Sequence, residues 1–268
     1  MASRSLAAIT FDVWHTLIYL DPKEEDRYLT AQLEALAAVL RGSRRSDRTD
    51  AAQVVEPEEA VRQTFLDASE RPGRGRALGD LAREAAQRAG REPSPALWVD
   101  ACEGLVARQP FRAVPGAQEQ LQRVRSEGYR TAVVSNLLGE TGQSMRRVLH
   151  RLGLAQYLEV QAFSDELPWA KPSPEIFWAA LHPLATHPRD AIHIGDLPDD
   201  IRGARAAGFR LAVRFDGARD YGRLYARLCH PEVPILPPPD RVLASWRTLP
   251  ELLTETFPEG PRAIKSPF

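Results

Sequence analysis

The chain has 268 residues, 43% of them hydrophobic and 26% charged, which is ordinary for a globular protein with one large core or with a core domain plus a smaller one. The formal net charge is −1 and no apolar run is as long as a membrane span, so we expect neither nucleic acid nor a membrane among its partners. The two cysteines, Cys102 and Cys229, lie far apart and the N-terminus lacks a signal-peptide pattern, which predicts a cytoplasmic protein.

The first predicted element is a strand near the N-terminus. Residues 6–11 form a short apolar run without polar alternation, which is typical of a strand buried on both faces of a parallel sheet. The run ends at Asp12. Ligands gather at the carboxyl ends of strands in open α/β sheets, so Asp12 is the first candidate for chemistry. The alternative is an aspartate that only caps the next element.

The stretch from residue 21 to about residue 110 has helical patterns and no strand between them. Apolar residues recur there at helical spacing, around residues 29–40, 57–65, 78–89 and 94–105. We therefore expect a small all-helical domain of residues 21–110, inserted into a core domain formed by residues 1–20 and 111–268.

The loop of residues 41–48, between the first two helices, is rich in arginine. Arginine is common along the whole chain, whereas lysine occurs at only three positions, so an arginine cluster carries little information here. A solvated turn is the simpler interpretation. The alternative is a loop in which Arg44 and Arg45 bind an anionic substrate.

Strands and helices alternate from residue 115 onward. Strands are expected at residues 129–134, 158–163, 191–194 and 209–215 and near residue 242, with helices at residues 115–128, 142–152, 173 onward, 200–207 and 249–256. Such alternation predicts an α/β fold with a doubly wound, Rossmann-like parallel sheet.

Polar residues stand where four of these elements end. They are Asp12 to Thr16, Ser135–Asn136, Lys171, and Asp196 with Asp200. In this order they resemble the four motifs of the haloacid dehalogenase superfamily of hydrolases. Residues 170–177 and 195–208 carry the most specific parts of the resemblance. The helical insertion lies where subfamily I places its type 1 cap, a lid over the active site.

The resemblance implies an aspartate nucleophile and a metal ion. A carboxylate such as Asp12 can attack phosphorus and form an aspartyl phosphate. Mg²⁺ prefers oxygen ligands, and the resemblance gives that role to Asp12, Asp196, Asp200 and the backbone carbonyl of Trp14. Without the resemblance, Asp196 and Asp200 could be acids at the positive end of a helix dipole.

The remaining motif residues are expected to hold the phosphoryl group. The resemblance implies that Ser135 and the Asn136 amide donate to its oxygens, that Lys171 bridges those oxygens and the nucleophile, and that Thr16 fixes the loop after Asp12. Taken alone, Ser135–Asn136 would be a common exit from a strand into a turn, and Lys171 could be a solvated loop residue.

Two residues depart from the pattern of the superfamily's phosphatases. A second aspartate, which protonates the leaving group, usually follows the nucleophile by two positions, and here Trp14 stands in its place and cannot transfer a proton. The next position is usually glycine and is here His15. An aromatic residue at the first position resembles the haloacid dehalogenases, which use no metal. The acidic pair Asp196 and Asp200 favours a metal site instead, because carboxylates beside Asp12 would repel one another without a cation.

The sequence thus predicts a Mg²⁺-dependent phosphohydrolase for a small phosphorylated metabolite, as a monomer or homodimer. Trp14 and His15 are expected to line the substrate site. One alternative is a metal-independent 2-haloacid dehalogenase. Another is a protein of low activity that binds a phosphorylated ligand or a partner.

Overall fold

The core of the protein is a six-stranded parallel sheet. A computed structural model describes residues 7–46, 54–218 and 238–261. The strand order in the sheet is β5-β4-β1-β6-β7-β8, with bounds β1 Ala8–Phe11, β4 Arg130–Ser135, β5 Val160–Phe163, β6 Ala191–Gly195, β7 Leu211–Phe215 and β8 Arg241–Leu243. The order steps outward in both directions from β1, as the doubly wound prediction requires, and that prediction is confirmed.

Strand β1 lies between β4 and β6, and its register brings three strand ends together. Phe11 is level with Val133 of β4 and with Ile194 of β6. All four residues of β1 are buried, which accounts for the continuous apolar run in the sequence. Asp12 therefore leaves the sheet beside the ends of β4 and β6, and its backbone amide donates to Ile194 O at 2.9 Å.

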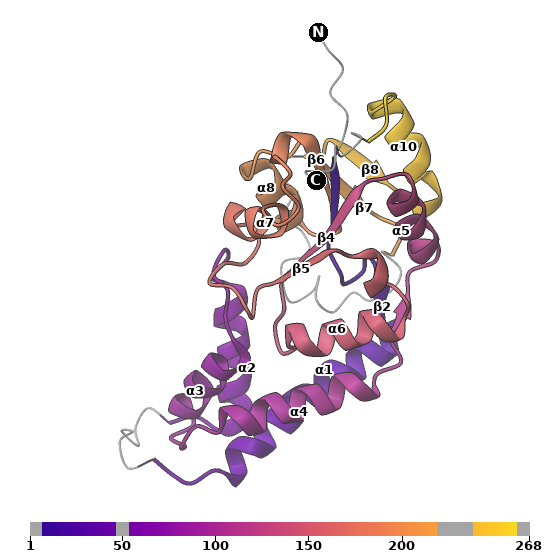
Figure 1. The fold of residues 1–268 in the computed structure, drawn as a ribbon. Coiled ribbons are helices and arrows are strands. Elements are labelled where there is room, and N and C mark those ends of the chain that lie inside the picture. The colour runs from indigo at the N-terminus through magenta and orange to yellow at the C-terminus, as the bar shows by residue number, and fades with distance from the viewer. Residues whose placement is uncertain (1–6, 47–53, 219–237, 262–268) are drawn as a thin grey trace.

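Helices cover both faces of this sheet (Figure 1). Helices α7 and α8 pack on one face with their own apolar cluster, and α5, α6 and α10 contribute to the larger cluster of the other face. Their bounds are α5 Ala117–Ser126, α6 Gly142–Arg151, α7 Pro174–Leu181, α8 Pro198–Ala206 and α10 Leu249–Thr256. Among the described residues, no helix is both long and apolar enough to cross a bilayer.

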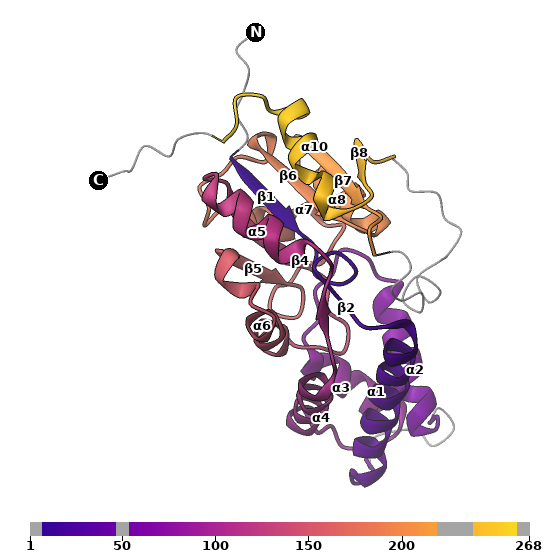
Figure 2. The ribbon, with the colours of Figure 1, turned by 90° about the vertical axis from the view of Figure 1, so that its right-hand side faces the viewer.

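Four further helices lie at one end of the molecule and form a cap with a separate apolar core. They are α1 Pro22–Gly42, α2 Pro57–Ser69, α3 Leu78–Arg88 and α4 Pro95–Arg108, close to the four helices expected from the sequence (Figure 2). The two chain crossings between cap and sheet pair as an antiparallel ribbon, β2 Ile18–Tyr19 with β3 Arg112–Ala113, which the sequence did not predict. The expected domain boundaries, with the cap formed by residues 21–110 and the core by residues 1–20 and 111–268, stay a prediction.

The cap contacts the core along helix α6. Thr141 at the start of α6 donates to Glu103 of α4 at 3.0 Å, and Arg147 donates to the same carboxylate at 2.9 Å. One turn further on, Arg151 donates to two carbonyls at the end of α4, Ala107 O at 3.0 Å and Gln109 O at 2.9 Å. These bonds run the length of α6 and hold the cap against the sheet domain.

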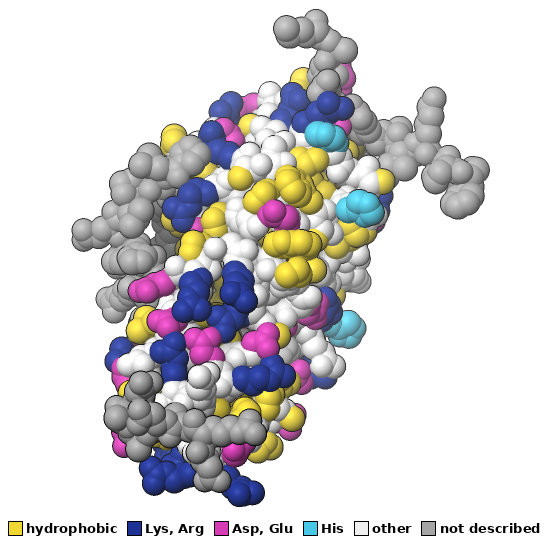
Figure 3. All heavy atoms as spheres, turned by 90° about the vertical axis from the view of Figure 1, so that its left-hand side faces the viewer, with side chains coloured by type: hydrophobic (Ala, Val, Ile, Leu, Met, Phe, Trp, Pro, Cys, Tyr) yellow, Lys and Arg dark blue, Asp and Glu magenta, His cyan; other side chains and the backbone are white. Residues whose placement is uncertain are grey.

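A second contact joins the loop between α2 and α3 to the loop that precedes Lys171. Gly75 N donates to Pro168 O at 3.1 Å, and Ala170 N donates to Gly73 O at 3.0 Å. A Cβ at position 75 would lie 2.8 Å or less from three carbonyl oxygens of the opposite loop, so only glycine fits there. The face of the molecule in Figure 3 carries charged side chains of both signs, consistent with the net charge of −1.

Candidate active site

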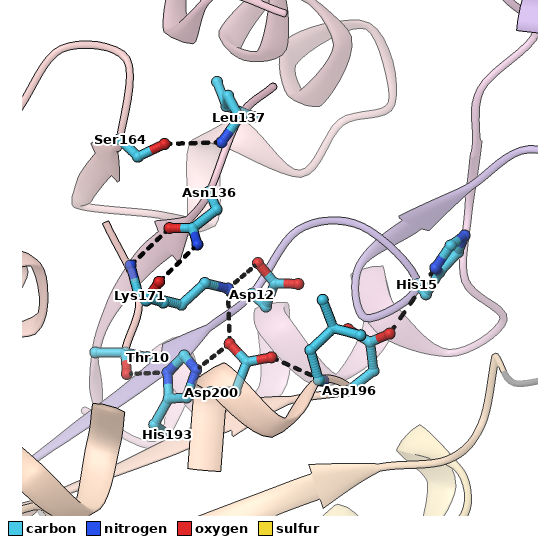
Figure 4. A network of polar contacts seen from close by, with 11 residues as sticks. Thr10, Asp12, His15, Asn136, Leu137, Ser164, Lys171, His193, Asp196 and Asp200 are labelled. Atoms are coloured by element: carbon cyan, nitrogen blue, oxygen red, sulfur yellow. Dashed lines mark hydrogen bonds and ion pairs between the residues drawn. The ribbon is translucent and has the colours of Figure 1, made fainter. Parts of the chain in front are cut away.

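The centre of the site is an ion pair between Asp12 and Lys171, both buried (Figure 4). Lys171 Nζ lies 2.6 Å from Asp12 Oδ1 and 2.6 Å from Asp200 Oδ1. Burial alone would lower the pKa of Lys171, but the two carboxylates outweigh it and raise the pKa above its usual value. The lysine is therefore a fixed cation that holds one oxygen of Asp12 in place, as a nucleophile in a positioned pair requires.

Asn136 fixes the backbone from which Lys171 projects. Its side chain accepts from Lys171 N at 2.7 Å and donates to Lys171 O at 3.0 Å. The next amide, Leu137 N, donates to Ser164 Oγ at 2.9 Å. The side chain of Asn136 thus orients the lysine loop, which the sequence did not predict. Ser135 is buried at the end of β4, the strand beside β1.

Three carboxylates gather at this edge of the sheet. One carboxylate oxygen from each of Asp12, Asp196 and Asp200 lies within 4.8 Å of the others, and Asp196 Oδ1 is buried without a hydrogen-bond partner. Burial and the neighbouring carboxylates raise the pKa of Asp196 well above its usual value. An all-oxygen set with an unpartnered buried oxygen suits Mg²⁺, so these residues fit the expected metal.

Asp200 has more protein partners than a simple metal ligand needs. Its Oδ1 lies 3.0 Å from His193 Nε2 in addition to Lys171, and its Oδ2 accepts from Leu197 N at 2.9 Å. Burial acts to raise its pKa, but Lys171 and His193 hold the pKa below its usual value. Asp200 is therefore an anion fastened to the protein on both oxygens.

Trp14 and His15 lie between the sheet edge and helix α1 of the cap. The Trp14 ring stacks on Tyr28 of α1 at 6.3 Å and meets Phe111 edge-on at 5.2 Å. His15 has a positive φ of 53°, a conformation that glycine adopts more readily. Its Nε2 lies 3.1 Å from Glu25 Oε2 of α1.

His15 also faces the carboxylate cluster. Its Nδ1 lies 3.8 Å from Asp196 Oδ2. Burial lowers the pKa of His15, but the hydrogen bond to Glu25 and the charges of Asp196, Glu25 and Asp12 outweigh it and raise the pKa above 6.5. A histidine in this setting holds a proton near the expected phosphoryl site.

Thr16 belongs to the turn after Asp12. Its backbone amide donates to Val13 O at 3.4 Å, and its carbonyl accepts from Trp246 Nε1 at 2.9 Å. Its hydroxyl is buried without a partner in the protein. The backbone of Thr16 therefore supports the loop, while the hydroxyl stays open to another donor or acceptor.

The structure does not bring Arg44 and Arg45 to this cluster. They follow the C-terminal end of α1, whose 21 residues extend over about 30 Å away from the sheet (Figure 2). Arg44 O accepts a hydrogen bond from Glu92 N at 2.8 Å, and the backbone of Arg45 forms an antiparallel β-bridge with that of Arg91 within the cap. This placement favours the solvated turn over the alternative in which Arg44 and Arg45 bind the substrate. Residues 47 and 48 of the same loop lie outside the described residues.

Three residues of the site escaped the sequence analysis. Glu25 stands among several acids at the start of α1, and nothing in the sequence separates it from its solvated neighbours. Thr10 and His193 lie inside predicted buried strands, where a polar residue is unusual. That signal was present in the sequence and could have pointed to a buried contact.

The parallel sheet with helices on both faces and the buried Asp12–Lys171 pair at the carboxyl ends of its strands define the class: an α/β protein with a charged site at the edge of a doubly wound sheet. A family model described as haloacid dehalogenase-like hydrolase matches residues 6–208. The chain therefore belongs to this family, and the resemblance inferred from its motifs is confirmed.

Sequence relatives agree with this family assignment. The chain is 35% identical over 97 residues to a phosphoglycolate phosphatase of Nitrosococcus oceani, covering 36% of this chain and 42% of that protein. It is 37% identical over 101 residues to a glyceraldehyde 3-phosphate phosphatase of Pyrococcus furiosus, covering 37% of this chain and 41% of that protein. The matched segment thus spans about two fifths of these relatives.

A solved structure also shares the fold. The crystal structure of a 2-haloacid dehalogenase from Pseudomonas syringae pv. Tomato DC3000 superposes with a TM-score of 0.62 at 22% identity, covering 93% of this chain and 99% of that chain. At this identity the likeness concerns the fold alone. It does not distinguish a phosphatase from a dehalogenase.

Proposed function

We propose that this protein is a Mg²⁺-dependent phosphohydrolase that acts on a small phosphorylated metabolite through an aspartyl-phosphate intermediate on Asp12. The observation that carries the proposal is the cluster of Asp12, Asp196 and Asp200 around a single lysine. Three carboxylates facing one ammonium group favour a bound cation. The two phosphatase relatives support the same reaction class.

In the first step the free carboxylate oxygen of Asp12 forms a bond to phosphorus, and the bond from phosphorus to the leaving oxygen breaks with its electron pair. Lys171 holds the other oxygen of Asp12 and keeps the nucleophile in line. Ser135 and the Asn136 amide would donate to the phosphoryl oxygens. When bound by Asp12, Asp196, Asp200 and the Trp14 carbonyl, Mg²⁺ would neutralise charge on the phosphoryl group.

In the second step water forms a bond to phosphorus, the bond from phosphorus to Asp12 breaks and frees its carboxylate, and the proton that water gives up returns to the group that protonated the leaving oxygen. The leaving oxygen of the first step needs a proton unless it is stable as an anion. Trp14 cannot supply it. We assign that role to His15, whose ring lies between Glu25 and Asp196 and whose pKa is raised by those carboxylates against the effect of burial.

A dehalogenase is the second candidate, and the aromatic contacts of Trp14 are the observation that favours it. Carbon–halogen cleavage requires no proton for the halide. The cluster of three acids weighs against it, because an enzyme without a metal would leave their repulsion uncompensated. A third candidate, a ligand-binding protein of low turnover, would retain the site and lack the reaction.

A release assay separates the three candidates. We expect phosphate release from p-nitrophenyl phosphate that depends on Mg²⁺ and is lost in Asp12→Asn, because a neutral amide is a poor nucleophile. Asp100→Asn, on the exposed side of α4, is the matched control and should retain activity. Halide release from a 2-haloacid without Mg²⁺ would support the dehalogenase, and no turnover of either substrate would support the binding protein.

The leaving group tests the replacement of the usual acid. General acid catalysis contributes about 10² to 10⁴-fold, so His15→Ala should slow alkyl phosphates by a factor in this range and leave aryl or acyl phosphates nearly unchanged. In the His15→Ala background, Trp14→Asp should selectively speed up the alkyl phosphates again. An unchanged rate for alkyl phosphates in His15→Ala would contradict the assignment of His15.

A further inference from the structure

His193 is a buried histidine that the proposed mechanism does not use. It lies in the middle of β6 with no exposed surface, and both of its ring nitrogens have side-chain partners. Nδ1 lies 2.8 Å from Thr10 Oγ1 of β1, and Nε2 lies 3.0 Å from Asp200 Oδ1 of α8. A polar side chain at this depth needs such partners, because an unpaired group there would be costly.

The backbone and two aromatic rings fix the orientation of His193. Thr10 and His193 are register partners in adjacent strands, so their side chains point to the same face of the sheet. Phe177 packs edge-on against the imidazole at 4.9 Å, and Phe209 does so at 6.2 Å. The ring therefore has little freedom to turn away from Asp200.

The contact with Asp200 fixes one hydrogen of the imidazole. An ionised carboxylate only accepts hydrogen bonds, so His193 Nε2 donates to Asp200 Oδ1. On the other side of the ring, Thr10 Oγ1 lies 2.8 Å from Nδ1, and its hydroxyl is also within 3.4 Å of Ile192 O. Both ring nitrogens are therefore engaged, and the donor at Nε2 is the one that reaches the site.

Asp200 passes this restraint on to Lys171. Its Oδ1 accepts from both His193 Nε2 and Lys171 Nζ, and Leu197 N holds its Oδ2. If the imidazole donor were lost, the carboxylate could turn about its own axis toward other partners. Lys171 Nζ, which bridges Asp200 and Asp12 at 2.6 Å each, would move with it.

We propose that Thr10 and His193 are positioning residues that, from inside the sheet, fix Asp200 and through it hold Lys171 on the nucleophile Asp12. Residues that orient a group at an active site without touching the substrate commonly change activity by about 10 to 100-fold when they are replaced. The kinetic consequence rests on the proposed hydrolysis, while the structural coupling does not.

The kinetic test uses Thr10→Val and His193→Phe, which remove one hydrogen-bonding group each and nearly preserve shape. We expect kcat to fall by about 10 to 100-fold in His193→Phe and by a smaller factor in Thr10→Val, with a smaller change in KM, because both residues act through the groups that contact the reacting phosphoryl group. The double variant should be no slower than His193→Phe. Thr10→Ser, which keeps the hydroxyl, should restore the wild-type kcat.

A stability cycle tests the coupling without turnover. We measure the urea midpoint of Thr10→Val, of Asp200→Asn and of the double variant. In the wild-type background the shift of the double variant should differ from the sum of the two single shifts, whereas in the His193→Phe background it should equal that sum. If His193→Phe does not fold, the cycle in the wild-type background decides alone, and His193→Gln, which keeps a donor, serves as the control that should retain the coupling. Additive shifts in the wild-type background, or an unchanged kcat in folded Thr10→Val and His193→Phe, would overturn the proposal. A wild type inactive on every phosphate would refute the proposed function and leave the cycle valid.

Discussion

Gly75 offers the sharpest test of how the cap docks on the core. In Gly75→Ala the new Cβ would lie 2.5 Å from Ser164 O and 2.8 Å from Trp169 O, and closer still to Leu167 O. These are backbone atoms, which cannot rotate away as a side chain would. The cap loop must therefore retreat from the loop that leads to Lys171.

The expected cost follows from this clash and from the two backbone hydrogen bonds across the junction. Overpacking in a well-packed region costs about 1–3 kcal/mol, and each lost hydrogen bond costs roughly 1 kcal/mol. The two effects overlap, because retreat of the loop relieves the clash by breaking the bonds. We therefore expect a loss of about 2 kcal/mol, equivalent to roughly 4–8 °C in Tm for a chain of this size.

Thermal unfolding and amide hydrogen exchange measure the effect. The amides of Gly75 and Ala170, which donate across the junction, should exchange faster in Gly75→Ala. The control is Gly79→Ala in α3, where a Cβ would meet Pro95 Cβ at an ordinary 3.4 Å, and where alanine should be neutral or stabilising by up to about 1 kcal/mol. If Gly75→Ala matched this control in Tm and in exchange, the docking described above would be refuted.

Three further predictions follow from charges. Burial raises the pKa of Glu140 to about 7, although Tyr28 donates a hydrogen bond to its carboxylate. Between about pH 4.5 and 7 the folded state therefore keeps a proton that the unfolded chain releases. The free energy of unfolding should fall by a few kcal/mol as the pH rises through this range. Glu140→Gln should remove this fall in urea unfolding. Added Mg²⁺ should raise Tm in a thermal melt, and Asp196→Asn should weaken that rise. Arg44→Ala and Arg45→Ala should leave KM unchanged for any phosphate ester, since both residues lie beyond the far end of α1. A raised KM would indicate that the loop contacts the substrate.

The sequence predicted the elements that local pattern controls. The apolar run before Asp12 is typical of an interior strand, and the alternation after residue 115 indicated parallel pairing, and both predictions are confirmed around β1. The proximity of Asp12 and Asp196 also followed, because they come directly after β1 and β6 and parallel strands deliver their carboxyl ends to one edge.

The remaining features depend on contacts between distant segments. The ribbon β2–β3 has two residues in each strand, too few for a periodic signal. Glu25 meets His15 only because α1 starts beside the site. The sequence left two interpretations open for Arg44 and Arg45, because composition records the charge of a loop and not its distance from the sheet. That distance was set by the length of α1.

The β2–β3 ribbon also bears on how such a protein can change over generations. Ile18 is level with Ala113 and Tyr19 with Arg112, so the chain leaves the core and returns to it through one pair of neighbouring strands about 5 Å apart. A tight turn could join them at this point without moving β1, β4 or β6. The helical insertion can therefore be exchanged for one of another shape or size while the strands around Asp12 keep their geometry, provided that the new insertion supplies a partner for His15 in place of Glu25.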